Sequence, residues 1–307
     1  HYLPIYLWPI LVFTLGFGLV RKVLAQSKAQ HSTSIADFLS ARYGKSASVA
    51  ALVTIIASVG SLPYMALQLR AIVLLLAPAE GQPMASAAPT FSETQIDARF
   101  FILTLIAACA ALCLPRQFHM TFVEAAGERA SPSMRWVFPA YLCVTAAVIV
   151  PIVLAGLSAL PAGTNPDSIV LALPLAQGNY ALAILVFIGG FSASAGMIVV
   201  ASVALSTMIT NDIIAPLVFR KALKGGHDPG ASGDRALLAA RLLMVRRVVI
   251  AGLLFLAYAF YLGFGRIGSL AGLGTLAFAA AAQFAPGLVL GMIIENGKKG
   301  GMLAGLS

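Results

Sequence analysis

Long apolar runs separated by short polar loops constrain this sequence more than any other feature. A helix that crosses a bilayer needs about 20 predominantly apolar residues, and seven segments reach or approach that length. They cover residues of about 2–20, 47–76, 100–114, 136–160, 180–208, 245–262 and 267–294. Only 10% of the 307 residues are charged, against roughly 25% in a soluble domain, so most of the surface must face lipid. The sequence therefore predicts an all-α membrane protein with about seven transmembrane helices in one domain, residues 1–307.

Two of these segments depart from a simple span. Residues 47–76 are too long for one straight helix perpendicular to the membrane, so we expect this segment to tilt, protrude or break, with Gly60 and Pro63 as break points. Residues 219–244 form a predicted cytoplasmic linker whose first part is polar and Gly-rich. The basic, leucine-rich segment at about 236–247 is expected to lie at the membrane interface before the next span.

The basic residues lie mostly on one side of the predicted spans. Seventeen Lys and Arg residues fall in segments 21–46, 115–135, 219–247 and the C-terminal tail, whereas the opposite side carries only Arg99 and Arg266. Cytoplasmic loops of membrane proteins carry an excess of Lys and Arg, so the N-terminus is predicted outside and the C-terminus in the cytoplasm. This distribution explains the formal net charge of +9, and no nucleic-acid partner is predicted.

The sequence contains no catalytic or metal-binding motif. It lacks HExxH, GxSxG and P-loop patterns, its four histidines are scattered, and no pair of carboxylates lies inside a span. The three cysteines lie in apolar segments without CxxC spacing, and we interpret them as small packing residues. We therefore expect neither enzymatic activity nor a bound metal or cofactor.

The second span carries polar groups that are unusual inside a membrane helix. Pro63 frees a backbone carbonyl, which is tolerated only where protein or a cavity covers it. Tyr64 and Gln68 are one helical turn apart and share a face, so these three residues form a predicted solute or ion site. Arg70 either takes part in function, as charges inside spans commonly do, or extends to the outer interface.

The fifth span contains a run of small residues between Gly189 and Met197. Ala193, Ser194, Gly196 and Met197 belong to a second predicted ion or solute site, because hydroxyls and freed backbone carbonyls coordinate cations. Tight packing between helices explains the same run equally well.

Two further polar features lie near helix ends. Gln283 is the lone polar residue of a small-residue stretch before Pro286, and it either faces a cavity or hydrogen-bonds another helix. The sequence Thr210–Asp212 follows the fifth span, and we interpret it as a polar helix end at the membrane interface.

Several stretches resemble the sodium/solute symporter family. Residues 33–45 (TSIADFLSARYGK) are similar to the loop after the family's third helix, and residues 191–212 (FSASAGMIVVASVALSTMITND) to its eighth core helix. Residues 268–306 are similar to its tenth core helix and the start of the next. The stretches LPYMALQLRAI and LPRQFHMTFVEA resemble a subgroup in which a symporter-like membrane domain is joined to the sensor histidine kinase of a two-component system.

The resemblance implies a LeuT-like architecture, in which two inverted five-helix repeats hold the solute near the membrane midplane. On this pattern the first two spans correspond to core helices two and three, and the other five to core helices six to ten. Residues 77–98 then stand in place of core helices four and five. The first core helix is missing upstream of His1, which lies inside an apolar run and indicates an excerpt of a longer protein. We expect an incomplete LeuT-like inverted-repeat bundle.

The resemblance also bears on sodium. In the family, sodium binds between the first and eighth core helices through a small-residue carbonyl and two neighbouring hydroxyls. These positions correspond here to Ala193, Gly196 and Met197, and the last two have no hydroxyl. Methionine sulfur is a poor ligand for a hard cation. We therefore predict that this chain alone has no functioning sodium site.

Three functions are compatible with these patterns. We expect a multi-pass protein of the bacterial inner membrane that transports a small organic, amino-acid-like solute. The alternative is a receptor in which the same fold senses the solute and signals to a fused or associated histidine kinase. A third interpretation is an inactive fragment that inserts and packs without transporting. The expected partners are the lipid bilayer, the solute and the kinase.

Overall fold

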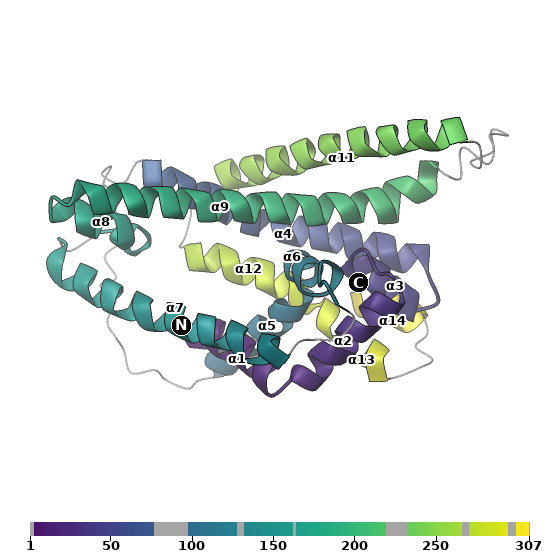
Figure 1. Ribbon diagram of the computed structural model, residues 1–307, viewed down its shortest axis with the longest axis horizontal. Coiled ribbons are helices and arrows are strands. Elements are labelled where there is room, and N and C mark those ends of the chain that lie inside the picture. The colour runs from purple at the N-terminus through teal and green to yellow at the C-terminus, as the bar shows by residue number, and fades with distance from the viewer. Residues whose placement is uncertain are drawn as a thin grey trace.

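The computed structural model describes residues 3–76, 98–127, 132–161, 164–218, 232–265, 270–293 and 299–306. Within these residues every regular element is a helix (Figure 1), as the sequence predicts. The elements are α1 (Leu3–Thr14), α2 (Phe17–Ala29), α3 (Ile35–Arg42), α4 (Ala47–Leu76), α5 (Ala98–Cys113), α6 (Pro115–Phe118), η1 (His119–Val123), α7 (Pro132–Ala159), η2 (Pro166–Ser168), α8 (Ile169–Ala176), α9 (Tyr180–Met208), η3 (Ile209–Ile214), α11 (Ser232–Phe260), η4 (Tyr261–Gly265), α12 (Leu270–Ala282), α13 (Phe284–Ile293) and α14 (Lys299–Leu306). Of these, η1, η3 and η4 are π-helical and η2 is a 3-10 helix.

Five helices of the described chain are long and apolar enough to cross a membrane. They are α4, α7, α9 with its continuation to Val218, the Ala240–Phe264 part of α11 and η4, and α12 with α13 over Leu270–Met292. The bent pairs α1–α2 and α5–α6 raise the number to seven if each pair is one span. The predicted number of about seven spans agrees with the larger of these two numbers. The helices are compatible with a multi-pass membrane protein.

The first predicted span is bent rather than straight. The segments Tyr6–Thr14 and Phe17–Ala29 meet at 73°, so the prediction of one helix over residues 2–20 is wrong. The turn between them is tight, because a Cβ added at Gly16 would lie 2.7 Å from the Val12 carbonyl oxygen. Glycine is the residue that permits this close backbone approach.

The third predicted span is also broken. Its two parts, Phe100–Cys113 and Pro115–Val123, meet at 46°. Pro115 has no backbone N–H and cannot continue the hydrogen bonding of α5, so it begins a new helical segment instead. Arg116 therefore lies in a helical segment that follows the bend, and not in an irregular loop as predicted.

The second span, by contrast, does not break. α4 is one continuous helix of 30 residues, contrary to the expected break at Gly60 or Pro63. Gly60 instead allows α12 to approach closely, because a Cβ added there would lie 2.5 Å from the Cβ of Ala280. Pro63 is buried. α4 packs against α3, α9, α11 and α12, and this surrounding protein supports a helix that its own sequence would be expected to interrupt.

The predicted linker over residues 219–244 is wrong in its second half. Residues 219–231 lie outside the described residues, but Ser232–Phe260 forms a single helix, α11. The basic, leucine-rich segment therefore belongs to the same continuous helix as the sixth candidate span, which covers Ala240–Phe264. Because the helix continues without interruption, its basic first turns extend directly from the apolar part that can enter a membrane.

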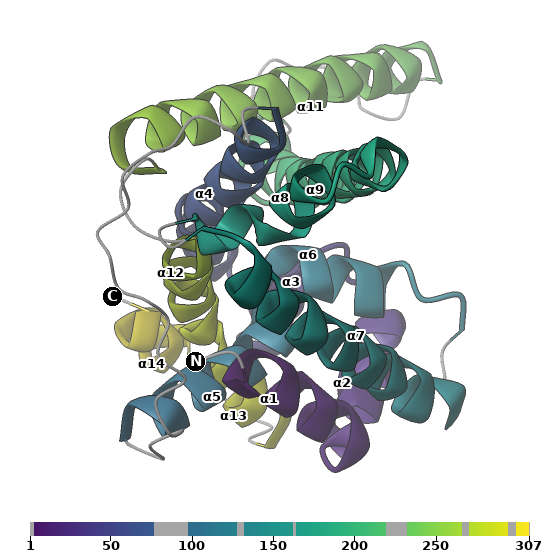
Figure 2. The same ribbon diagram turned by 90° about the vertical axis from the view of Figure 1, so that its left-hand side faces the viewer.

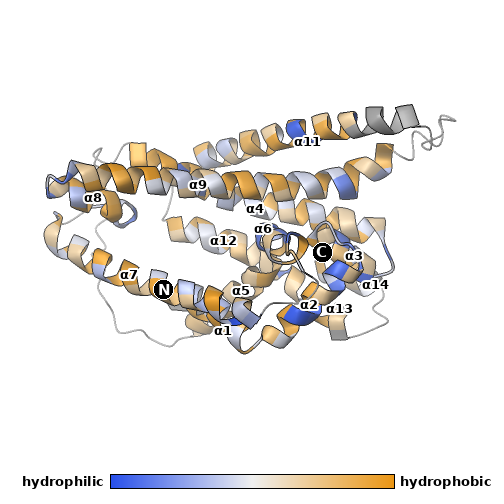
Figure 3. Cartoon of the chain, in the orientation of Figure 1, coloured by the Kyte–Doolittle hydropathy of each residue, from blue (hydrophilic) through white to orange (hydrophobic). Residues whose placement is uncertain are grey.

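α4 lies inside the bundle, whereas three other long helices lie at its edge. Figures 1 and 2 show α11 on one side of α4 and α9, with α7 on the opposite side of the molecule. Apolar residues cover most of α7 and α9 (Figure 3). Large apolar side chains on α7, α9 and α11 are exposed, among them Trp136, Leu185 and Phe255. Apolar faces of this extent fit a lipid environment.

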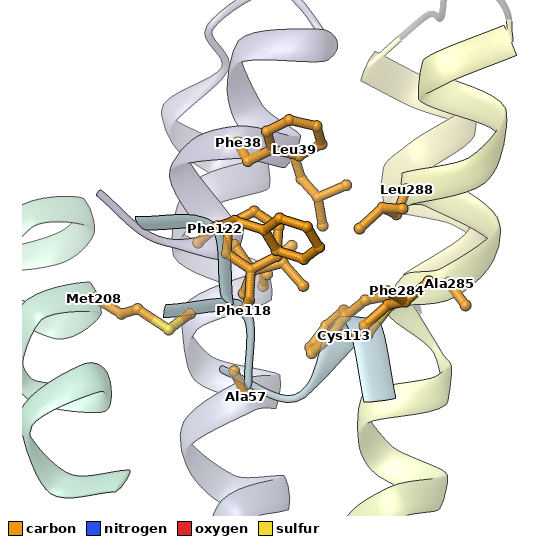
Figure 4. Close-up of a cluster of buried hydrophobic side chains, with 14 of the residues drawn as sticks. Phe38, Leu39, Ala57, Cys113, Phe118, Phe122, Met208, Phe284, Ala285 and Leu288 are labelled. Carbon is orange, nitrogen blue, oxygen red and sulfur yellow. The ribbon is translucent and has the colours of Figure 1, made fainter. Parts of the chain in front are cut away.

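The main core contains an aromatic stack. The ring of Phe118 lies 5.5 Å from that of Phe38 and 5.0 Å from that of Phe122, measured between centroids. Figure 4 shows these side chains between Met208 of α9 on one side and Leu288 of α13 on the other. All five side chains are almost fully buried. The stack holds α6 and η1 against α3, and it thereby fixes the position of the neighbouring Arg116.

Segments predicted to share one side of the membrane contact one another. The Lys28 ammonium donates a hydrogen bond of 2.8 Å to the Val123 carbonyl, joining two segments predicted on the cytoplasmic side. At the other end of the bundle, the Leu270 amide donates to the Asp167 carboxylate at 3.2 Å. Each of these two hydrogen bonds therefore joins segments that the charge distribution places on the same side of the membrane.

Candidate functional site

A polar cluster joins α4, α6 and α9, with Tyr64 and Arg116 half-buried and Met197 exposed. The Tyr64 hydroxyl accepts a hydrogen bond from Arg116 Nη1 at 2.6 Å and donates one to Met197 Sδ at 3.0 Å. Gln68 lies one turn further along α4, on the same face as Tyr64, and is buried. The Arg116 guanidinium lies over the Tyr64 ring, with Cζ 4.6 Å from the centroid. This stacking adds a cation–π attraction to the hydrogen bond. We refer to Tyr64, Gln68, Arg116 and Met197 as the central cluster.

Local structure explains why these side chains meet. Tyr64 and Gln68 follow one another on the same face of α4, as helical spacing requires. Pro115 ends α5, and the bend directs Arg116 toward α4 instead of into a loop. Met197 reaches the cluster from α9, which packs along α4.

A small cavity adjoins the central cluster. Its lining residues are Ser61, Tyr64, Leu114, Pro115, Arg116, Ala201 and Leu205. The cavity encloses about 10 Å³, which is enough for about one water molecule. The space beside the cluster is therefore smaller than an organic solute, which needs the lining side chains to move before it fits there.

A second and larger cavity lies further along the same two helices. It encloses about 380 Å³ between the end of α4 at Ala71–Leu75, α8, and the first half of α9. Ser194 lines it and is buried, and Asp167 is the charged residue of its described lining. This volume falls in the range of small-molecule pockets. The larger cavity and the small cavity thus follow one seam between α4 and α9, and the Tyr64–Met197 contact lies in that seam.

The other residues predicted from sequence do not join the central cluster. Ala193 and Gly196 are exposed on α9, and no atom lies within 4 Å of a Cβ added at Gly196. Gln283 is exposed at the break between α12 and α13. Pro63 is buried in α4 next to Tyr64. Arg70 is only 8% exposed, so its side chain is covered by protein.

A second polar cluster surrounds the π-helical η3. The Asp212 carboxylate accepts hydrogen bonds from the hydroxyls of Ser34 at 3.1 Å and Thr54 at 3.2 Å. The Asn211 amide donates to the Thr33 hydroxyl at 3.3 Å. The helix continues beyond these residues to Val218, so the interpretation of a simple polar helix end is wrong. η3 instead connects α9 to α4 and to the start of α3.

Sequence reasoning found Tyr64, Gln68 and Met197 but missed Arg116 as their partner. The sequence places Arg116 in a loop because it follows a short apolar run and adds to the basic residues of one side. The available signal was the sequence Leu114-Pro115, since a proline after an apolar run indicates either a helix end or a break within a span. Hydropathy alone does not separate these two outcomes.

Comparison of the chain with protein-family models, with curated proteins and with solved structures gives no match. The similarity to the sodium/solute symporter family therefore remains a prediction from the quoted motifs.

Proposed function

We propose that this chain transports a small organic, amino-acid-like solute across a bacterial inner membrane along the seam between α4 and α9. The observation that carries the proposal is the central cluster, in which Arg116 contacts Tyr64 among apolar helices. Charged and polar residues inside membrane spans are costly and commonly mark solute pathways. The cavity of about 380 Å³ supplies an approach to the cluster from the predicted outer side.

The finer fold that we propose is an incomplete LeuT-like inverted-repeat bundle. Transporters of this architecture hold their solute where spans are discontinuous near the membrane midplane. One bend supports the proposal, between α5 and α6 at Leu114–Pro115, where the two helical segments meet at 46°. Broken spans are tolerated where protein or a cavity covers the freed backbone groups.

A solute sensor is the second candidate function, and one observation favours it. Of the three residues at the expected sodium positions, Gly196 and Met197 carry no hydroxyl, and Ala193 and Gly196 are exposed. None of the three lines the small cavity. A domain that binds solute without ion coupling suits a receptor that signals to a fused or associated histidine kinase. We keep this as the alternative to transport.

For the orientation, we propose that the N-terminus lies outside and the C-terminus lies in the cytoplasm. Single cysteines at Ser158 and Lys45, in a chain whose native cysteines are replaced by alanine, test this in intact cells. A membrane-impermeant maleimide should label Ser158→Cys directly and Lys45→Cys only after permeabilisation. The reverse pattern contradicts the proposed orientation.

Transport is tested with the full chain reconstituted in liposomes. We expect uptake of at least one labelled amino acid in counterflow, and Gln68→Met should abolish it because it removes the amide beside Tyr64. Gln177→Met is the matched control, since Gln177 is exposed at the end of α8, and it should transport normally. If amino acids bind but none is taken up, the sensor is favoured; if none binds, both functions are contradicted.

A further inference from the structure

We propose that the solute carries a carboxylate, and that Arg116 binds this carboxylate by giving up its hydrogen bond to Tyr64. This inference rests on the proposed solute site and names the chemical class of its ligand. In the solute-free state the Tyr64 hydroxyl accepts the hydrogen bond from Arg116 that one carboxylate oxygen of the solute accepts in the bound state. When solute binds, the guanidinium turns from the hydroxyl to the anion.

The first argument is charge. Arginine stays ionised in proteins, yet no carboxylate in the described part of the chain pairs with Arg116. Its contacts there are the hydroxyl and the ring of Tyr64, which are both neutral. The side chain is half-buried, and a charge that is partly withdrawn from water without a counter-charge loses solvation free energy. A cation kept at that cost beside a cavity indicates an anionic ligand.

The second argument is the geometry of the donors. The guanidinium has five N–H groups in a planar fork, which matches the two oxygens of a carboxylate. One nitrogen, Nη1, donates to Tyr64 at 2.6 Å. The side chain is half-buried and lines the small cavity beside Tyr64. The remaining donors therefore stay available to an anion that enters this cavity.

The third argument is that Tyr64 is easily released. Its hydroxyl donates to Met197 Sδ at 3.0 Å, and a thioether is a weak acceptor. Gln68 lies beside it on α4 and supplies another hydrogen-bonding group. When Arg116 turns to a carboxylate, the Tyr64 hydroxyl keeps partners within the cluster or hydrogen-bonds the solute. No buried polar group is left without a partner by the exchange.

The competing explanation is that Arg116 only ties α6 to α4. A structural tie requires the Arg116–Tyr64 contact to be permanent, whereas an exchange requires the two contacts of Arg116 to compete. The two explanations therefore predict opposite effects of removing the Tyr64 hydroxyl. A tie predicts weaker solute binding because the site loosens, and an exchange predicts tighter binding of carboxylates.

Equilibrium binding to the purified full chain in detergent tests the proposal with three matched probes for each amino acid. These are the free acid, its carboxamide and the corresponding decarboxylated amine. We expect the free acids to bind and the carboxamides and amines not to bind. Arg116→Gln should weaken binding of the acid about 10- to 100-fold, as the loss of a charge-assisted hydrogen-bonded pair predicts. Arg116→Lys should retain part of the affinity, because it keeps the charge but not the fork.

Two further variants keep the test decisive if Arg116→Gln folds poorly. Tyr64→Phe should raise the affinity for the acid about two- to tenfold, because the neutral hydrogen bond that competes for Arg116 is gone. Arg241→Gln, at an exposed arginine of α11, is the matched control and should bind as the wild type does.

Each outcome decides between the claims. Equal binding of acids and carboxamides by the wild type overturns the carboxylate inference and leaves the proposed solute site intact. Weaker binding by Tyr64→Phe overturns the exchange. If the wild type binds none of the three probes of any amino acid, the proposed function fails together with the inference.

Discussion

A Cβ added at Gly60 of α4 would lie 2.5 Å from the Cβ of Ala280 of α12. Real side-chain contacts are longer, so Gly60→Ala must push the two helices apart. We expect the variant to lose about 1–3 kcal/mol of stability, which is the typical cost of overpacking. Thermal unfolding in detergent measures this loss. Adding Ala280→Gly should recover most of this loss. Gly252→Ala is the control, because no atom lies within 4 Å of its added Cβ, and an equal loss there would contradict the close contact.

Asp212 should couple energetically to Thr54. Its carboxylate accepts hydrogen bonds from Thr54 and from Ser34, the N-cap residue of α3. Asp212→Ala leaves these hydroxyls without that acceptor, and we expect a loss of about 1–3 kcal/mol. In a double-mutant cycle with Thr54→Val, the combined loss should be smaller than the sum of the two single losses. Asp167→Ala, far along the bundle, is the control: its loss of stability and that of Thr54→Val should simply add. If the losses of Asp212→Ala and Thr54→Val also simply add, the hydrogen bond between these two residues is contradicted.

Tyr43 gives a pH-dependent prediction. Its hydroxyl donates to the Gly287 carbonyl at 2.9 Å, and burial raises the pKa of Tyr43 although Arg42 opposes the shift. The folded state then holds the phenolic proton more tightly than the unfolded state, whose pKa is about 10. The stabilisation is complete below about pH 10 and is lost as the pH rises through the folded-state pKa. Tyr43→Phe should cost about 0.5–1.5 kcal/mol near neutral pH, and the difference between variant and wild type should shrink at alkaline pH. A difference that is independent of pH would contradict this assignment.

Solute binding should not require sodium. Gly196 and Met197 have no hydroxyl, and Gly196 is exposed away from the central cluster. Replacing sodium chloride by choline chloride at constant ionic strength should therefore leave the dissociation constant of the solute unchanged. Potassium chloride is the control for a general cation effect. A sodium-specific increase in affinity would mean that other groups of the chain bind the ion.

The amino-acid sequence predicts the helical class well because a membrane span is a long-range average over many apolar residues. The limits of α9 agree with the predicted span of residues 180–208 for this reason. Breaks are predicted poorly, because they depend on neighbours that sequence does not supply. Pro63 is covered by packed helices and leaves α4 intact, whereas Pro115 ends α5. The same residue type therefore has opposite outcomes in two apolar segments.

The candidate site likewise contains residues that sequence predicts and residues that it does not. Tyr64 and Gln68 are recognisable from sequence because helical spacing within one element brings them together. Arg116 and Met197 reach them only through the packing of α6 and α9 against α4. Asp212 likewise acquires its partners from α3 and α4. Contacts between distant segments are set by tertiary structure, and local patterns do not encode them.

The central claim is that a solute occupies the space beside Tyr64 and Arg116, and cysteine protection at Ser61 tests it most directly. Ser61 lines the small cavity and is 6% exposed. In a chain whose native cysteines are replaced by alanine, Ser61→Cys is treated with a small thiol reagent, with and without saturating amino acids. The account predicts that at least one free amino acid slows modification of Ser61→Cys while leaving the exposed Ser158→Cys unaffected. Equal modification rates at Ser61→Cys with every amino acid would contradict the account.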